Sequence, residues 1–108
     1  MKFILIIREN IYAQRTSEEL MEIIRLHKSW YVQLAEKGYA IDGNGISEKG
    51  NLLEMIDGKV HVQPIRDVEE GIGGYYIIEA KDLEEAIEVA KGCPTYDKGD
   101  KIEVRQIM

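Results

Sequence analysis

Residues 55–108, MIDGKVHVQPIRDVEEGIGGYYIIEAKDLEEAIEVAKGCPTYDKGDKIEVRQIM, carry an ordered series of turn, strand and helix signals. Asp57-Gly58 separates two apolar-rich runs at residues 52–56 and 59–63. This dipeptide favours a type I′ hairpin, because both of its residues tolerate positive φ. Pro64 cannot donate a ladder hydrogen bond, so the second strand is expected to end there or to lie at an edge.

The rest of this half predicts a strand, a helix and a strand. Residues 66–71 form a charged loop, and residues 75–79 are rich in strand-forming side chains. The helix is expected over residues 82–90, because Asp82 and Glu85 have capping-box spacing and Gly92 with Pro94 ends it. Residues 102–107 read as the final strand.

The first half predicts a strand, a long helix and a short strand. In residues 2–8 both alternating sets of side chains are apolar, which is typical of a strand covered on both faces. After a polar connection at residues 9–15, Thr16 with Glu19 begins a helix over residues 16–37, and Gly38 ends it. A strand at residues 39–42 is expected to end at residues 43–45. The helix carries one apolar stripe: Leu20, Ile23, Ile24, His27, Trp30, Tyr31 and Leu34.

The element order is therefore β-α-β, a β-hairpin, and β-α-β. This order predicts an α+β fold, a ferredoxin-like single domain over residues 1–108 with an inserted β-hairpin. Its two helices would cover one face of the sheet. Residues 3–7 and 75–78 are also apolar on the other side, so we expect a second copy of the chain to cover that face in a homodimer.

Composition excludes several classes of protein. The net charge of −6 would repel phosphates, so nucleic acid is not an expected partner. The apolar run at residues 3–7 is too short to span a membrane. Cys93 is the only cysteine, which excludes an intrachain disulfide and fits a reducing cytoplasm.

The order and spacing of these motifs resemble the DGPF-type branch of the YCII-related family. The resemblance covers nearly the whole chain and is loose only at residues 10–15 and 46–51. It rests on the opening strand, the hairpin around Asp57-Gly58, the proline after it, the Gly-Gly-Tyr-Tyr run at residues 73–76, Cys93-Pro94, Gly99 and the last strand. This family is similar in fold to dimeric α+β barrels, so the resemblance also implies a dimer.

The family signature is altered here. Of Asp-Gly-Pro-Phe only the proline survives, in the VQPI of residues 62–65. In smaller YCII-like relatives, a histidine on the first helix and an aspartate before a proline are the proposed active-site pair. His27 matches that histidine, eleven residues before Gly38, whereas Cys93 stands at the aspartate position. The resemblance therefore implies that the pair is broken in this chain.

His27 is the candidate catalytic residue. It lies within the apolar stripe of the first helix, where burial would favour its neutral form, and it could exchange a proton near neutral pH. The alternative is a packed histidine with one backbone partner.

Three further residues are candidates for ligand binding. Arg8 ends the first strand and could hold a carboxylate or phosphate of a small anionic organic ligand, or pair with a nearby glutamate. Cys93 is expected near His27 through the family pair, although a thiol after a helix C-terminus reads as a small buried residue. Tyr76, with Tyr75, Tyr31 and Trp30, could line a cleft or form core and interface.

No cofactor or metal is expected. Asp67, Glu69 and Glu70 lack EF-hand spacing and read as a solvated acidic loop, and His27 with His61 forms no zinc motif. The glycines at residues 71–74 precede a strand, whereas a phosphate cradle precedes a helix.

Two classes of function stay open from the residues. The missing aspartate favours a small-ligand-binding or interaction module that acts as a homodimer. The alternative is an enzyme of the isomerase or lyase kind, in which His27 moves the proton and Arg8 orients an anionic substrate. A His27 side chain open to a polar cleft would favour the enzyme, and one sealed in apolar packing would favour the module.

Overall fold

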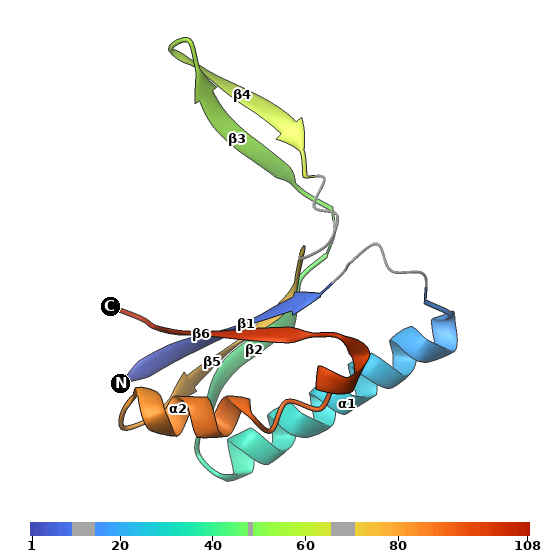
Figure 1. Ribbon diagram of the computed structural model, residues 1–108, viewed down its shortest axis with the longest axis vertical. Helices are drawn as coiled ribbons and strands as arrows, with labels where there is room; N and C mark the ends of the chain where they lie inside the picture. The colour runs from blue at the N-terminus through green and yellow to red at the C-terminus, as the bar shows by residue number, and fades with distance from the viewer. Residues whose placement is uncertain (10–14, 48, 66–70) are drawn as a thin grey trace.

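The computed structural model describes residues 1–9, 15–47, 49–65 and 71–108. Along the chain its elements are β1 (Lys2–Glu9), α1 (Ser17–Glu36), β2 (Ala40–Gly45), β3 (Asn51–Ile56), β4 (Lys59–Pro64), β5 (Gly71–Glu79), α2 (Leu83–Ala90), the 3-10 helix η1 (Tyr96–Lys98) and β6 (Lys101–Gln106). This order is the predicted β-α-β, hairpin, β-α-β (Figure 1).

Four strands form one antiparallel sheet in the order β2-β5-β1-β6. This is the strand order of a ferredoxin-like domain, and both helices lie on the same side of the sheet (Figure 1). The strands β3 and β4 pair only with each other and extend away from the sheet (Figure 1). The predicted α+β class with an inserted β-hairpin is confirmed.

The core fills the space between the sheet and the helices. On β1, Phe3 and Leu5 are fully buried and Ile7 nearly so, because alternate residues of a strand point to the same face. They pack with Trp30 and Leu34 of α1, among others. The intervening Ile4 and Ile6 are half-buried on the other face, and their register partners there are Ile77 and Tyr75.

The helix α1 has the predicted ends. Thr16 accepts a hydrogen bond from the Glu19 amide, the Glu19 side chain accepts one from the Thr16 amide, and Gly38 has a φ of 83°. The apolar stripe, however, is buried in only one half of the helix. Trp30 and Leu34 are buried in the core, whereas Leu20 and Ile24 are 48% and 53% exposed. The first half of the helix therefore presents its apolar side to open space beside the sheet.

Two strands extend beyond their predicted ranges by more than one residue at one end. The strand β2 continues through Gly43 to Gly45 instead of ending at Asp42, and β5 begins at Gly71 instead of Tyr75. Gly43 lies opposite Tyr76, where a Cβ would come within 2.9 Å of Cδ1 of that ring. Glycine here allows close packing of the strand on an aromatic ring rather than ending the strand.

The hairpin turn is as predicted, with φ of 50° at Asp57 and 78° at Gly58, and β4 ends at Pro64. Asp82 caps α2 through the Glu85 amide, although the Glu85 side chain accepts from the Lys81 amide and not from that of Asp82. The acidic loop of Asp67, Glu69 and Glu70 lies outside the described residues. None of the helices in the described ranges is long and apolar enough to cross a membrane.

Candidate functional site

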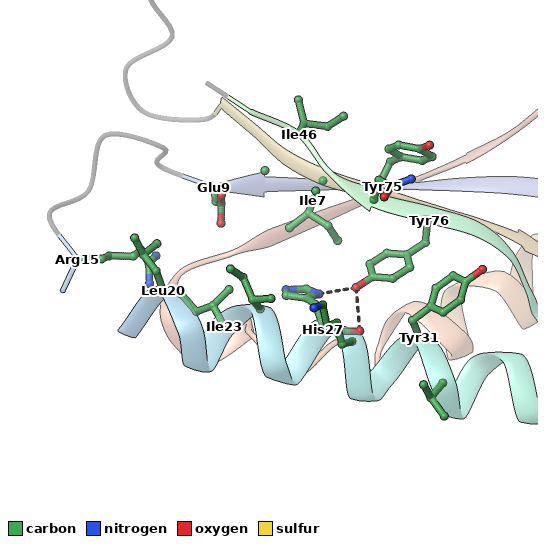
Figure 2. A pocket seen from close by; sticks show the side chains of 18 residues that line it. Ile7, Glu9, Arg15, Leu20, Ile23, His27, Tyr31, Ile46, Tyr75 and Tyr76 are labelled. Atoms are coloured by element: carbon green, nitrogen blue, oxygen red, sulfur yellow. Dashed lines mark hydrogen bonds between the residues drawn. The ribbon is translucent and has the colours of Figure 1, made fainter. Parts of the chain in front are cut away.

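A cavity of about 810 Å³ lies between the first half of α1 and the helix-facing side of the sheet (Figure 2). Its walls are mainly apolar and aromatic, with contributions from glycine backbone of β2 and β5. The side chains include Ile7, Leu20, Ile23, Ile24, Tyr31 and Tyr76. The exposed half of the α1 stripe is therefore one wall of this cavity, which explains why it lacks a protein partner.

His27 lies in this wall (Figure 2), and both of its ring nitrogens form hydrogen bonds. Its Nδ1 is 2.6 Å from the hydroxyl of Tyr76, and its Nε2 is 3.0 Å from Oγ1 of Thr95. The helix α1 supplies the histidine, β5 the tyrosine, and the segment after α2 the threonine. Three distant parts of the chain thus meet at one imidazole.

Thr95 links the imidazole to a buried carboxylate. Thr95 is fully buried and Asp100 is 6% exposed, and the two side chains are 2.6 Å apart from Oγ1 to Oδ2. A threonine hydroxyl has one hydrogen, which it donates to the carboxylate, so its oxygen accepts from Nε2–H of His27. Nδ1 of the neutral ring then carries the lone pair and accepts from Tyr76.

The environment favours this neutral imidazole. Burial lowers the pKa of His27, and the nearby Asp100 carboxylate offsets part of that decrease. Burial also raises the pKa of the Tyr76 phenol, as does the neighbouring Cys93, so Tyr76 keeps its proton and donates it. At neutral pH, the chain of donors therefore runs from Tyr76 to His27 and from there through Thr95 to Asp100.

Aromatic packing fixes the position of Tyr76. The Trp30 ring meets it edge to face, with centroids 4.8 Å apart and planes at 72°, and the Tyr31 ring stacks at 6.3 Å. Such pairs add to the stabilisation that burial gives. Tyr75, the preceding residue, lies on the opposite face of the sheet, where its hydroxyl donates to Asp42 at 3.2 Å.

The structure brings three of the four predicted site residues together. His27 and Tyr76 share a hydrogen bond in the cavity wall, and Cys93 lies behind them, with Sγ 3.5 Å from the Thr95 oxygen that His27 also contacts. Burial raises the pKa of the Cys93 thiol, and its side chain is 5% exposed. Cys93 therefore fits the predicted buried residue and is a poor nucleophile.

Arg8 lies elsewhere. Alternation along β1 places it on the face away from the helices, where it pairs with Glu103 at 3.3 Å. It does not line the cavity, so the predicted proximity of Arg8 to His27 is not found. Its surroundings match the other interpretation, an arginine at a strand end that pairs with a glutamate.

Sequence reasoning missed the residues that complete the site. No sequence motif indicated that Thr95 and Asp100 meet. The two residues come together because the chain turns through Tyr96–Lys98 and Gly99, which has a φ of 92°. Glu9 did carry a signal. It continues the inward series of Phe3, Leu5 and Ile7, and it lines the cavity.

No cluster suited to a metal ion is found in the parts of the chain that the structure describes, when groups of three or more histidine, cysteine, aspartate and glutamate side chains are considered. The hydrogen bonds of His27 with Tyr76 and Thr95 make this residue suited to proton transfer.

The model of the YCII-related domain matches residues 1–108. The chain belongs to the YCII-related family. The narrower assignment to its DGPF-type branch stays a prediction. Among solved structures, the fold is similar to that of 5-chloro-2-hydroxyhydroquinone dehydrochlorinase from Burkholderia phenoliruptrix AC1100, in a complex with 2,5-dihydroxybenzoquinone. That likeness has a TM-score of 0.51 and 18% identity, and it covers 100% of this chain and 94% of the other. No curated protein matches the chain.

Proposed function

We propose that this YCII-related protein is an acid–base enzyme of the isomerase or lyase kind, which acts on a small ring compound with His27 as the proton acceptor. The observation that carries the proposal is a series of hydrogen bonds that begins at Tyr76 and His27 in the wall of the 810 Å³ cavity and continues behind it to Thr95 and Asp100. A histidine held in one tautomer by a buried carboxylate is suited to general base catalysis.

The proton would move as follows. A ligand that displaces the Tyr76 hydroxyl from Nδ1 of His27 gives a proton to that nitrogen. The positive charge on the ring is stabilised through Thr95 by the Asp100 carboxylate, which takes the part of the aspartate missing at Cys93. Return of the proton to another atom of the ligand completes an isomerisation, and departure of a group from the neighbouring carbon completes an elimination.

The cavity walls favour a planar ring as the ligand. Tyr31 and Tyr76 offer aromatic faces, and Ile7 and Ile23 add apolar surface. A ring of this kind, 2,5-dihydroxybenzoquinone, is bound in the dehydrochlorinase of similar fold. It is therefore the probe chosen for this chain. Arg15 and Lys28 also line the cavity and suit an anionic ligand better than Arg8 does.

We also propose that the protein is a homodimer that joins through the sheet face away from the helices. Neighbouring strands present Ile4 beside Ile77 and Ile6 beside Tyr75 on that face, and no element of the described chain covers it (Figure 1). Burying such an apolar surface against a second copy is favourable. The single cysteine supports a reducing cytoplasm as its location, and the negative charge still argues against nucleic acid as a partner.

The binding-module interpretation makes a different prediction for the same site. His27 is half-buried in the wall of a mainly apolar cavity, so it is neither open to a polar cleft nor sealed in apolar packing. Its hydrogen bonds to Tyr76 and Thr95 are what support the enzyme. A module would bind the ring without moving its protons.

Both interpretations can be tested with 2,5-dihydroxybenzoquinone. Trp30 is the only tryptophan and packs against Tyr76, so its fluorescence reports binding in the cavity. Turnover is measured by proton NMR in deuterated water, as loss of the ring C–H signal of the probe. We expect the wild type to bind and to accelerate this exchange, and His27→Gln to bind without accelerating it.

His61→Gln is the matched control, because His61 lies on the exposed hairpin strand β4. It should behave like the wild type in both measurements. Binding without any acceleration by the wild type would show a module and overturn the enzyme. If the probe leaves Trp30 fluorescence unchanged at millimolar concentration, the cavity is not a site for such rings.

A further inference from the structure

Glu9 places a carboxyl group in a cavity whose wall is otherwise largely apolar. It is the last residue of β1 and points from that strand toward α1, on the same side of the sheet as His27 and Tyr76 (Figure 2). Strand alternation makes it the fourth member of the inward series after Phe3, Leu5 and Ile7. A core position at that end of the strand would normally be apolar, so the carboxyl group needs a reason.

The neighbouring strand is shaped to accept this carboxyl group. The register of β1 and β5 shifts between Ile7 and Arg8, so that Ile7 pairs with Gly74 and Arg8 pairs with Ile72. Gly73 is the residue left over in β5. A Cβ at Gly73 would overlap the Glu9 carboxyl group. Because glycine has no side chain, the Glu9 carboxyl group can occupy this space.

The Glu9 carboxyl group interacts with nearby charges but has no hydrogen-bond donor among the described residues. Burial raises its pKa, the Asp100 carboxylate adds to that increase, and Arg15 offsets part of it. Across the residues that the structure describes, no donor forms a hydrogen bond with the Glu9 side chain, whereas His27 uses both of its ring nitrogens. Beside the cations Arg15 and Lys28, Glu9 is therefore the hydrogen-bond acceptor of the cavity wall that is left to bind a hydroxyl group of a ligand.

We propose that Glu9 determines specificity, by forming a hydrogen bond with a hydroxyl group that the ring ligand carries in addition to the group facing Tyr76 and His27. The ligand class is then a ring with at least two oxygen substituents. This inference rests on the proposed function, because it requires that rings bind in the cavity. A ring with one hydroxyl group would cover the half-buried Glu9 carboxyl group without giving it a partner, and such an unmet polar group lowers affinity strongly.

The test compares phenol with the three dihydroxybenzenes, catechol, resorcinol and hydroquinone. Binding is measured by calorimetry and by the NMR shift of the Trp30 indole N–H. We expect the wild type to bind one of the three isomers about tenfold more tightly than phenol, as a hydrogen bond to a charged group would give. The preferred isomer reports where Glu9 lies relative to Tyr76.

Variants then assign the preference to Glu9. Glu9→Ala should bind phenol at least as tightly as the wild type, because it has no carboxyl group to leave without a partner, and it should lose the preference for a second hydroxyl group. Gly73→Ala should lose it too although Glu9 is retained, because the new Cβ displaces the carboxyl group. Glu79→Ala is the control, since Glu79 lies at the far end of β5 with its side chain 53% exposed. It should keep the preference.

The outcomes separate the two proposals. If phenol binds but the wild type shows no preference, or if Glu9→Ala keeps the preference, the role of Glu9 is wrong and the ring-binding cavity stands. If neither phenol nor any dihydroxybenzene binds, both proposals fail. Should Gly73→Ala not fold, the comparison of Glu9→Ala with Glu79→Ala still decides.

Discussion

Thr95 donates its only hydroxyl hydrogen to Asp100, with 2.6 Å between Oγ1 and Oδ2, and this bond dictates what His27 can do. The threonine oxygen is left as an acceptor, so Nε2 of His27 must carry the proton and Nδ1 must face Tyr76 with its lone pair. Thr95, which does not line the cavity, therefore sets the tautomer of His27, which does.

Removing this hydroxyl should separate the two ends of the network. Thr95→Val keeps the shape of the side chain but leaves Nε2 of His27 and the buried Asp100 carboxylate without their shared partner. We expect a loss of about 1–3 kcal/mol in the free energy of unfolding, measured by urea denaturation. Thr95→Ser retains the hydroxyl and should lose clearly less. Equal losses in the two variants would show that packing, and not the hydrogen bonds, makes this site matter.

Moving the carboxylate should test whether Asp100 takes the part of the missing family aspartate. Cys93→Asp alone would place a second carboxylate beside Thr95 and Asp100, and we expect it to destabilise the fold through repulsion in a buried site. Asp100→Asn alone should lower the pKa of His27 further, because Asp100 is what raises it. The double variant should recover stability relative to Cys93→Asp. If the effects of the two substitutions simply add, the two positions do not share a role.

Much of the fold could be predicted because its signals are local. The capping pair of Thr16 and Glu19 and the positive φ of Asp57 and Gly58 depend on neighbours within a few residues, and the structure has them as predicted. Gly43 was misread because its role is not local. Glycine between short runs usually marks a turn, but here it allows β2 to pack against the Tyr76 ring.

The site could be predicted only in part. His27 and Tyr76 stood out by their type and their place in apolar runs, whereas Asp100 lies 73 residues after His27 in sequence and meets it only through Thr95. Arg8 was also a candidate by its residue type, but side chains alternate along β1, so that of Arg8 lies on the sheet face away from the helices. Had that alternation been followed one residue further, it would have pointed to Glu9.

The proposed dimer predicts a mass and a way to disrupt it. Light scattering at micromolar concentration should give twice the 12.4 kDa of the chain. Ile6→Glu puts a charge on the open face of the sheet and should shift the protein to monomer or reduce its solubility. Leu53→Glu on the exposed hairpin is the control and should leave the mass unchanged. A wild type that stays monomeric and soluble would contradict the dimer.

The hairpin turn makes an independent prediction for the variant Asp57→Ala with Gly58→Ala. Both positions have positive φ, which alanine adopts at a cost of about 1 kcal/mol or more per residue. The hairpin should therefore lose protection from hydrogen exchange, while 2,5-dihydroxybenzoquinone binding is unaffected because the cavity contains no residue of β3 or β4. Unchanged exchange in the hairpin would contradict this account of the turn.

The most direct test of the central claim is a pH titration of His27 by ¹⁵N NMR of its ring nitrogens, with His61→Gln used to assign the signals. We predict a neutral ring protonated at Nε2 at pH 7, with a pKa below the ordinary value of 6.5. The unfolded chain would then bind the proton first, so the free energy of unfolding should fall as pH decreases below 6.5. A ring protonated at Nδ1, or a pKa at or above 6.5, would contradict the relay from Tyr76 through His27 and Thr95 to Asp100.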